Sequence, residues 1–154
     1  MSLSVEPESS LQDDVRTMIG SLDGFMNQLA PAEANFPMTA EEMAGDSTTV
    51  FMARDSDRQP IGMGCLKRHE GRVGEVKRMW SDPSRRGEGI GASVLAAIVT
   101  KATSLGLREL VLETGTAEEY APAWRLYERA GFEECQPVLD YPPSEHSRFY
   151  RKVL

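Results

Sequence analysis

The sequence predicts an α+β (α/β) fold with a mixed, mostly antiparallel sheet of about six to seven strands flanked by helices. Three strand-like runs, TTVFMA, IGMGCLK and VGEVKRMW, follow one another, and the turn-rich segment RDSDRQP separates the first two. This order predicts an antiparallel meander. A glycine-rich loop and a helical repeat come next, followed by a strand, a second helix and two closing strands.

The N-terminal segment is predicted to hold an edge strand and an amphipathic helix. The strand covers LSVEP and ends at Pro7, because proline lacks the N–H that would continue a ladder. Over residues 10–29 the apolar positions recur three or four apart. That spacing is typical of one amphipathic helix, or of two short helices broken near Gly20 and Gly24.

Two further helices are marked by their ends. Thr39 and Glu42 have the spacing of a capping box, which predicts a brief helix ending before Gly45. Residues 90–105 repeat apolar side chains along one face, and Gly106 stands where a glycine commonly ends a helix.

The C-terminal part continues with LRELVLET, which predicts a strand. A helix follows, with Pro122 in its first turn and Gly131 at its end, the positions at which these residues are tolerated or favoured. Two closing strands are predicted over FEECQPVLDY and SRFYRKVL.

Length and charge limit the function classes. The 154 residues predict a single domain over residues 1–154. The formal net charge is -7, and the first 60 residues hold eleven acidic against three basic residues. Nucleic-acid binding is not expected, because it depends on clustered Lys and Arg. The acidic half would attract a cationic partner.

Membrane and metal partners are not expected either. No apolar run approaches the ~20 residues of a membrane-spanning helix, and the N-terminus lacks the pattern of a signal peptide, so we expect a cytoplasmic protein. Cys65 and Cys135 are predicted to be small buried side chains. His69 and His146, which are predicted to lie at the surface, leave a metal site short of ligands.

The glycine-rich segment 85–92, RRGEGIGA, carries the clearest chemical signal. Glycines let the backbone turn tightly, and the start of a helix offers unpaired N–H groups and a partial positive charge, which together suit an anion. A P-loop is excluded because its lysine is absent. Two alternatives remain: a plain helix start, and a dinucleotide fingerprint, since Gly87-x-Gly89-x-x-Ala92 loosely fits GxGxxA.

Two motifs resemble those of the GNAT superfamily of N-acetyltransferases. Arg86-x-x-Gly89-x-Gly91 matches the central loop motif of that family, and residues 126–132, LYERAGF, match its LYxxxGF element. The resemblance implies the GNAT acyl-CoA N-acyltransferase fold and acetyl-CoA as cosubstrate. Residues 48–154 would then form the acetyl-CoA-binding core, and the helices of residues 1–47 would frame the acceptor.

The resemblance also implies which residues hold acetyl-CoA. Backbone groups of Met79, Trp80 and Ser81 would pair with the pantetheine arm like an added strand. Backbone N–H groups of the loop would hold the pyrophosphate, namely those of Arg86, Gly87, Glu88, Gly89, Gly91 and Ala92.

Two catalytic residues are predicted. Tyr127 matches the family tyrosine that protonates the departing thiolate; the alternative is a core aromatic on an amphipathic helix. Glu75 is the candidate base, since many GNAT proteins place a carboxylate on this strand; the alternative is an ion pair with Lys77 or Arg78. Glu113 and Glu33 are alternates. Phe25, Phe36, Met38 and Met43 are candidates for the acceptor wall, and Tyr141, Ser144 and Ser147 are weaker ones.

The predicted function is transfer of an acetyl group from CoA to a primary amine of a small molecule or peptide by direct attack. The principal alternative is a non-catalytic acyl-CoA-binding module, and a nucleotide-dependent oxidoreductase is the third hypothesis. The expected partners are acetyl-CoA and an amine acceptor, and a homodimer is possible because dimers are common in the family.

Overall fold

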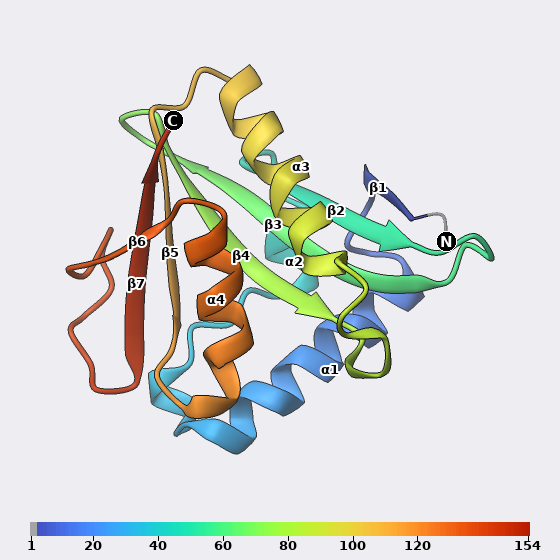
Figure 1. Ribbon diagram of the computed structural model, residues 1–154, viewed down its shortest axis with the longest axis horizontal. Helices are drawn as coiled ribbons and strands as arrows, with labels where there is room; N and C mark the ends of the chain where they lie inside the picture. The colour runs from blue at the N-terminus through green and yellow to red at the C-terminus, as the bar shows by residue number, and fades with distance from the viewer. Residues whose placement is uncertain (1–2) are drawn as a thin grey trace.

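The computed structural model describes residues 3–154, which form one seven-stranded sheet in the order β1-β2-β3-β4-β5-β7-β6 (Figure 1). All neighbouring strands are antiparallel except β4 and β5. The predicted α+β class and the edge position of the N-terminal strand are confirmed. The strands are β1 (Ser4–Pro7), β2 (Thr48–Arg54), β3 (Pro60–His69), β4 (Val73–Ser81), β5 (Glu109–Gly115), β6 (Glu133–Cys135) and β7 (Ser147–Val153).

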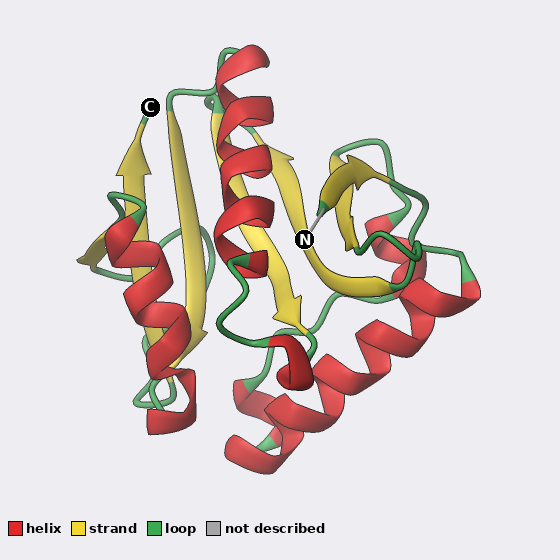
Figure 2. Ribbon diagram, turned by 45° about the vertical axis from the view of Figure 1, so that its right-hand side comes forward, coloured by secondary structure: helices red, strands yellow, loops and turns green. Residues whose placement is uncertain are grey.

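Four α-helices cover the two faces of the sheet, and three single 3-10 turns join them to the rest. Helices α3 and α4 lie side by side on one face, as Figure 2 shows, and α1 and α2 pack on the other. The helices are α1 (Asp13–Leu29), α2 (Ala40–Met43), α3 (Ile90–Ser104) and α4 (Ala121–Arg129), and the 3-10 turns are η1 (Ala32–Ala34), η2 (Pro83–Arg85) and η3 (Glu118–Tyr120).

Helix α1 is continuous, so the predicted alternative of two helices broken near Gly20 and Gly24 is wrong. Both glycines are exposed, and a Cβ at either would meet nothing within 4 Å. The opposite side of the helix buries an unbroken apolar stripe, which includes Val15 and Leu22. Burial of that stripe outweighs the roughly 1 kcal/mol that each glycine costs a helix.

Separate apolar layers fill the two faces of the sheet. Leu66, Val76 and Leu110 pack with α3 and α4, whereas Val50, Met63 and Cys65 pack with α1 and α2. The layers follow from the period-two alternation of strand side chains. Cys65 is buried as predicted, but Cys135 on the edge strand β6 is only half-buried, so that part of the prediction is wrong.

Strands β4 and β5 form a fork. They pair at only three positions, Val73 with Glu109, Gly74 with Leu110 and Glu75 with Val111. Beyond Glu75 the strands diverge, which is visible in Figure 2. β4 continues beside β3 to its end and β5 continues beside β7, so each keeps an edge without a strand partner inside the fork.

A β-bulge bends β4 just beyond the start of the fork. Met63 pairs with Trp80 and Cys65 pairs with Lys77, so Gly64 faces both Arg78 and Met79. Arg78 has a left-handed backbone, with φ 58°. A bulge leaves one residue outside the ladder and re-aims its neighbours, and here it does so at the residues predicted to contact pantetheine.

The last two strands differ from the prediction. Strand β6 covers only Glu133–Cys135, although a strand was predicted to reach Tyr141. Pro137 and the pair Pro142 and Pro143 interrupt the following segment, and proline cannot donate to a ladder. Residues 136–146 therefore form a loop before β7. In the chain from residue 3 onward, none of the helices combines the length and apolar character needed to cross a membrane.

Replacing Leu110 with Ala should lower the free energy of unfolding by about 2–5 kcal/mol, the usual cost of emptying a tightly packed site. Its side chain is 0% exposed and packs in the layer under α3 and α4. Urea denaturation measures the change. Leu11, which is 46% exposed, supplies the control: Leu11→Ala should change the free energy by less than about 0.5 kcal/mol. Equal losses in the two variants would contradict the assigned core.

Candidate active site

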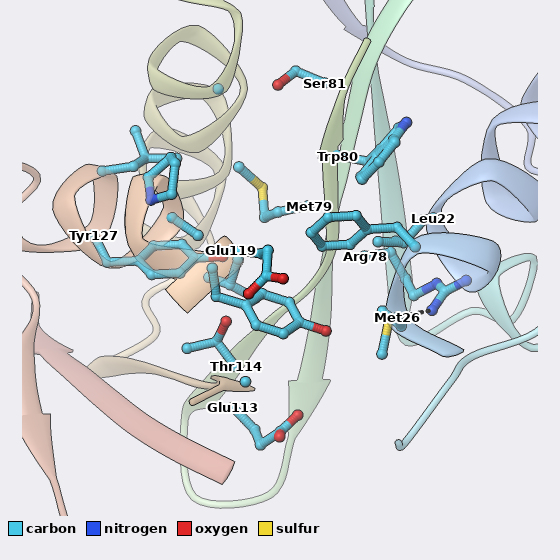
Figure 3. A pocket seen from close by; sticks show the side chains of 18 of the residues that line it. Leu22, Met26, Arg78, Met79, Trp80, Ser81, Glu113, Thr114, Glu119 and Tyr127 are labelled. Carbon is cyan, nitrogen blue, oxygen red and sulfur yellow. Dashed lines mark hydrogen bonds between the residues drawn. The ribbon is translucent and has the colours of Figure 1, made fainter. Parts of the chain in front are cut away.

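A cleft of about 490 Å³ passes through the fork. It is lined by β4 and β5, by α1 and the segment that follows it, by η3 and α4, and by the glycine-rich loop. The cleft therefore connects the glycine-rich loop with side chains on the α1 face of the sheet. Figure 3 shows Tyr127 entering it from α4 and Met79 from β4 on the opposite side.

The glycine-rich loop forms one end of the cleft. Gly87 and Gly89 have left-handed φ angles of 90° and 79°, which glycine adopts without strain. Helix α3 begins at Ile90, and the first bond across its start runs from the Ser93 N–H to the Gly89 carbonyl. The N–H groups before Ser93 have no partner within the helix, so they can bind an anion.

The predicted loop residues line the cleft with one exception. Arg86, Gly87, Gly89, Gly91 and Ala92 are on its wall, whereas Glu88 is not. The Glu88 carboxylate turns back and accepts from Arg85 Nε at 2.9 Å, so its negative charge is paired beside the loop.

Met79, Trp80 and Ser81 line the cleft along β4, beyond the last pair with β5 (Figure 3). The guanidinium of Arg86 lies 5.4 Å from the centre of the Trp80 ring. Trp80 lines the cleft and also packs against the apolar layer under α1, with its ring centre 5.3 Å from that of Phe25. Trp124 packs against the other layer, and its Nε1 donates to the Gly115 carbonyl at 2.9 Å.

Tyr127 is both a core aromatic and a cleft residue. Its ring packs 5.9 Å from the rings of Phe132 and Tyr150, and its side of α4 faces the cleft. Within residues 3–154 its hydroxyl makes no hydrogen bond. Burial, followed by the charge of Glu113, raises the pKa of the Tyr127 phenol well above its ordinary range. At neutral pH it therefore keeps its proton.

Glu75 lies at the branch point of the fork and is only 3% exposed. Its Oε1 contacts His69 Nε2 at 2.8 Å, and its Oε2 accepts from Lys77 Nζ at 3.3 Å and from the Tyr141 hydroxyl. Glu75 lines the cleft as predicted, and it also forms the ion pair with Lys77 that was the alternative. Arg78 binds Asp23 instead, at 2.5 Å.

The expectations from the sequence were wrong for two residues that contact Glu75. His69 was expected at the surface, but its side chain is 25% exposed and contacts Glu75. Tyr141 was only a weak candidate, yet its hydroxyl reaches Glu75 and Lys77 from the proline-rich loop. No local pattern marks either contact, because Tyr141 and Glu75 lie 66 positions apart in the chain.

Glu113 lies on β5, two residues beyond the last pair of the fork, on the same face of the sheet as Glu75. Its Oε2 accepts from Ser147 Oγ at 2.9 Å, and its Oε1 accepts no hydrogen bond from residues 3–154. Burial is the main reason that the pKa of Glu113 is raised. Glu33, the other alternate, is exposed on η1 and does not line the cleft.

The acceptor wall contains two of the four N-terminal residues proposed for it. Phe25 and Phe36 line the cleft. Met38 and Met43 do not, because they are 4% and 1% exposed in the layer under α1 and α2. Phe25 packs 5.5 Å from Tyr120, so α1 and η3 meet across the mouth of the cleft.

The model of the acetyltransferase (GNAT) family matches residues 21–132. The chain belongs to this GNAT family. IAA acetyltransferase of Azospirillum brasilense is 36% identical over 154 residues, 99% of each chain. The uncharacterized N-acetyltransferase YsnE of Bacillus subtilis is 34% identical over 129 residues, 84% of this chain and 85% of YsnE.

Solved structures share the fold of this GNAT protein. A candidate acyl-CoA N-acyltransferase from Klebsiella pneumoniae superposes with a TM-score of 0.82 and 26% identity, covering 99% of this chain and 97% of the other. The GNAT fold predicted from the sequence is thus confirmed, and the chain is an N-acetyltransferase. The family also excludes the oxidoreductase interpretation of the glycine-rich loop.

Proposed function

We propose that this GNAT protein transfers an acetyl group from acetyl-CoA to a primary amine of a small molecule or peptide by direct attack. The observation that carries the proposal is the cleft through the fork, which joins an anion-binding helix start to a chamber with buried carboxylates. Direct attack is supported by the position of the thiols. Neither cysteine lines the cleft, and burial raises the pKa of Cys65 to about 12, which keeps it an unreactive thiol.

The residues of the cleft fit acetyl-CoA. The pyrophosphate is assigned to the N–H groups of residues 86–92, with Arg86 beside it. Pantetheine lies along Met79–Ser81, where β4 has no β5 partner, and takes the place of the missing strand. The thioester then lies between Met79, whose N–H polarises the carbonyl, and Tyr127 on the other wall.

Two carboxylates are placed to remove the proton of the ammonium group, Glu75 and Glu113. Both oxygens of Glu75 are engaged by His69, Lys77 and Tyr141. Glu113 has an oxygen without a donor and a raised pKa, which suits a base working near neutral pH. We therefore assign the role of general base to Glu113. Glu75, which was the candidate base from the sequence, is assigned the positioning of Lys77 and Tyr141.

The proton and bond changes balance with these residues. Glu113 takes a proton from the ammonium, and the amine nitrogen attacks the thioester carbonyl. The new N–C bond forms as the C–S bond breaks, and Tyr127 gives its proton to the departing thiolate. The nitrogen passes its second proton to solvent as the amide forms, solvent returns a proton to Tyr127, and Glu113 releases its proton to solvent. The products are an N-acetylamine and CoA.

Calorimetric titration of the purified chain with acetyl-CoA, CoA and NAD tests the first half of the proposal. We expect binding of the two CoA compounds and none of NAD. A thiol-release assay over a panel of primary amines tests the second half. Absence of CoA binding at millimolar ligand would overturn the proposal, and binding without release for any amine would favour an acyl-CoA-binding module. Light scattering on the same sample shows whether the protein is a homodimer or a monomer.

Gly89→Ala should weaken acetyl-CoA binding about 5- to 30-fold. Gly89 caps α3 with φ 79°, and a left-handed backbone costs residues other than glycine roughly 1–2 kcal/mol, where 1.4 kcal/mol is a factor of about ten. Because a Cβ at Gly89 meets nothing within 4 Å, the effect comes from the backbone conformation that aims the N–H groups. Calorimetry measures the dissociation constant.

Gly20→Ala in α1 is the matched control, because that glycine is equally unobstructed and has ordinary helical geometry. Acetyl-CoA affinity should be unchanged in this variant. An unchanged affinity in Gly89→Ala as well would remove the loop from the binding site.

A further inference from the structure

We propose that the acceptor is an arylalkylamine, that is, a primary aliphatic amine attached to an aromatic ring, without a carboxylate. This inference rests on the proposed acetyl transfer and names the class of molecule that the chamber beside Glu113 takes. Three features of the cleft carry it: cations that are already neutralised, carboxylates in excess, and a wall of aromatic rings.

The cations on the acceptor side are engaged by the protein itself. Lys77 Nζ donates to Glu75 Oε2 at 3.3 Å and to the Tyr141 hydroxyl at 2.7 Å. Arg78 is 7% exposed and is paired with Asp23. An acceptor carboxylate would have to displace Glu75 or Asp23 from its cation and leave that carboxylate without a partner, which is most unfavourable for Glu75, whose side chain is 3% exposed.

The remaining cations of the cleft are placed elsewhere. Arg85 and Arg86 belong to the glycine-rich loop, and Arg129 lies one turn beyond Leu126, which approaches Gly91 at the start of α3. Their places in the chain put these side chains toward the glycine-rich-loop end of the cleft, where Arg85 pairs with Glu88 and Asp55. His146 also lines the cleft, and its Nε2 lies 3.5 Å from the carboxylate of Glu145.

Carboxylates are in excess on the same side. Glu75 and Asp23 balance Lys77 and Arg78, which leaves Glu113 and Glu119. Figure 3 shows the Glu119 carboxylate near the middle of the cleft, with Glu113 at its lower end. Within residues 3–154 neither Glu113, which is half-buried, nor Glu119, which is exposed at the cleft, forms an ion pair, so both can attract an ammonium group. An aliphatic amine carries that charge at neutral pH and needs the base that Glu113 provides.

Aromatic rings enclose this charged region. Phe25 on α1 packs 5.3 Å from Trp80 and 5.5 Å from Tyr120. Phe36, from the segment after η1, packs edge-on against Tyr141 at 5.0 Å. All five rings line the cleft. They offer faces and edges to an aromatic ring of the acceptor, and electron-rich faces to its ammonium.

Acetylation of four acceptors by the full chain tests the inference. Phenethylamine has the ring and the amine, L-phenylalanine adds only a carboxylate, hexylamine lacks the ring, and a lysine-containing peptide represents a macromolecular acceptor. We expect kcat/KM for phenethylamine to exceed that of each of the others at least about tenfold, since one lost ion pair or ring contact is worth about that factor.

The outcomes separate this inference from the proposed function. Equal rates for phenylalanine or hexylamine would overturn the aromatic amine class while leaving acetyl transfer intact. The same conclusion follows if only the peptide is acetylated. If none of the four is acetylated but another amine in a wider panel is, the inference is again wrong, whereas no transfer to any amine overturns the proposed function itself.

Three variants connect the preference to particular side chains. Phe36→Leu keeps an apolar wall but removes the ring, so kcat/KM for phenethylamine should fall about three- to tenfold with no fall for hexylamine. Glu119→Lys should raise the rate with phenylalanine relative to phenethylamine, and Glu119→Gln should do so less. Glu119 is exposed, so both changes are compatible with folding. If the ratios of kcat/KM between phenethylamine and the other acceptors are unchanged in all three variants, the acceptor does not lie beside Phe36 and Glu119, and the inference is wrong.

Discussion

Tyr127→Phe should lower kcat about 10²- to 10⁴-fold, the usual contribution of a placed general acid, and leave acetyl-CoA binding unchanged. The hydroxyl of Tyr127 makes no hydrogen bond within residues 3–154, so its removal breaks no contact of the fold, while the ring keeps its packing against Phe132 and Tyr150. Steady-state kinetics together with calorimetry for acetyl-CoA measure the two quantities.

Tyr150→Phe is the control for this change. Tyr150 is 0% exposed, packs against the Tyr127 ring and bonds Glu128 at 2.8 Å, but it does not line the cleft. The Tyr150→Phe variant should lose stability without a loss of kcat comparable to that of Tyr127→Phe. If Tyr127→Phe keeps the kcat of the parent, the thiolate leaves without a proton from this residue, and the assignment is wrong.

The pH dependence follows from the environment of the phenol. The pKa of Tyr127 is held above the ordinary tyrosine value of about 10 by burial. The proton required by the leaving thiolate is therefore retained throughout the neutral and mildly alkaline range. No alkaline fall in kcat is expected from Tyr127 below about pH 10.

Features encoded by a few neighbouring residues were predictable from the sequence. The capping box of Thr39 and Glu42 is present as predicted, and so is the end of α3 before Gly106, where φ is 73°. The left-handed backbones of Gly87 and Gly89 before the start of α3 follow from glycine spacing and a helix start, which are both local signals. Pro122 lies in the first turn of α4, also as predicted.

Features made by distant segments could not be predicted in the same way. The fork depends on where β5 leaves β4, and nothing in the sequence of Glu75 or Val111 marks the last pair. The partners of Glu75 come from β3, β4 and the loop before β7. A carboxylate at this position could therefore be named as a candidate, but its ion pairs could not be ranked against catalysis before the fold was known.

Glu113→Gln should lower kcat/KM about 10²- to 10⁴-fold near neutral pH, because the amide cannot take the proton of the ammonium group. In the parent the rate should fall as the pH drops through the pKa of Glu113, since the protonated carboxyl is no longer a base. Burial raises that pKa, so this fall should begin at a higher pH than for an ordinary glutamate. The Glu113→Gln variant should lack this fall at acid pH, and pH profiles of kcat/KM for the parent and the variant measure the difference.

Glu75→Gln distinguishes the role of Glu75 from that of Glu113. Lys77, whose side chain is 13% exposed, would lose its ion pair, so this variant should lose thermal stability and bind the amine more weakly, but it should keep the acid fall of the rate. An arylalkylamine that is largely unprotonated near neutral pH, such as a phenethylamine fluorinated on its side chain, should restore the rate of Glu113→Gln and not that of Tyr127→Phe, because only the first variant lacks the base. If instead Glu75→Gln abolishes the acid fall and is rescued by the fluorinated amine, the base is Glu75, and Glu113 serves only to hold the ammonium group.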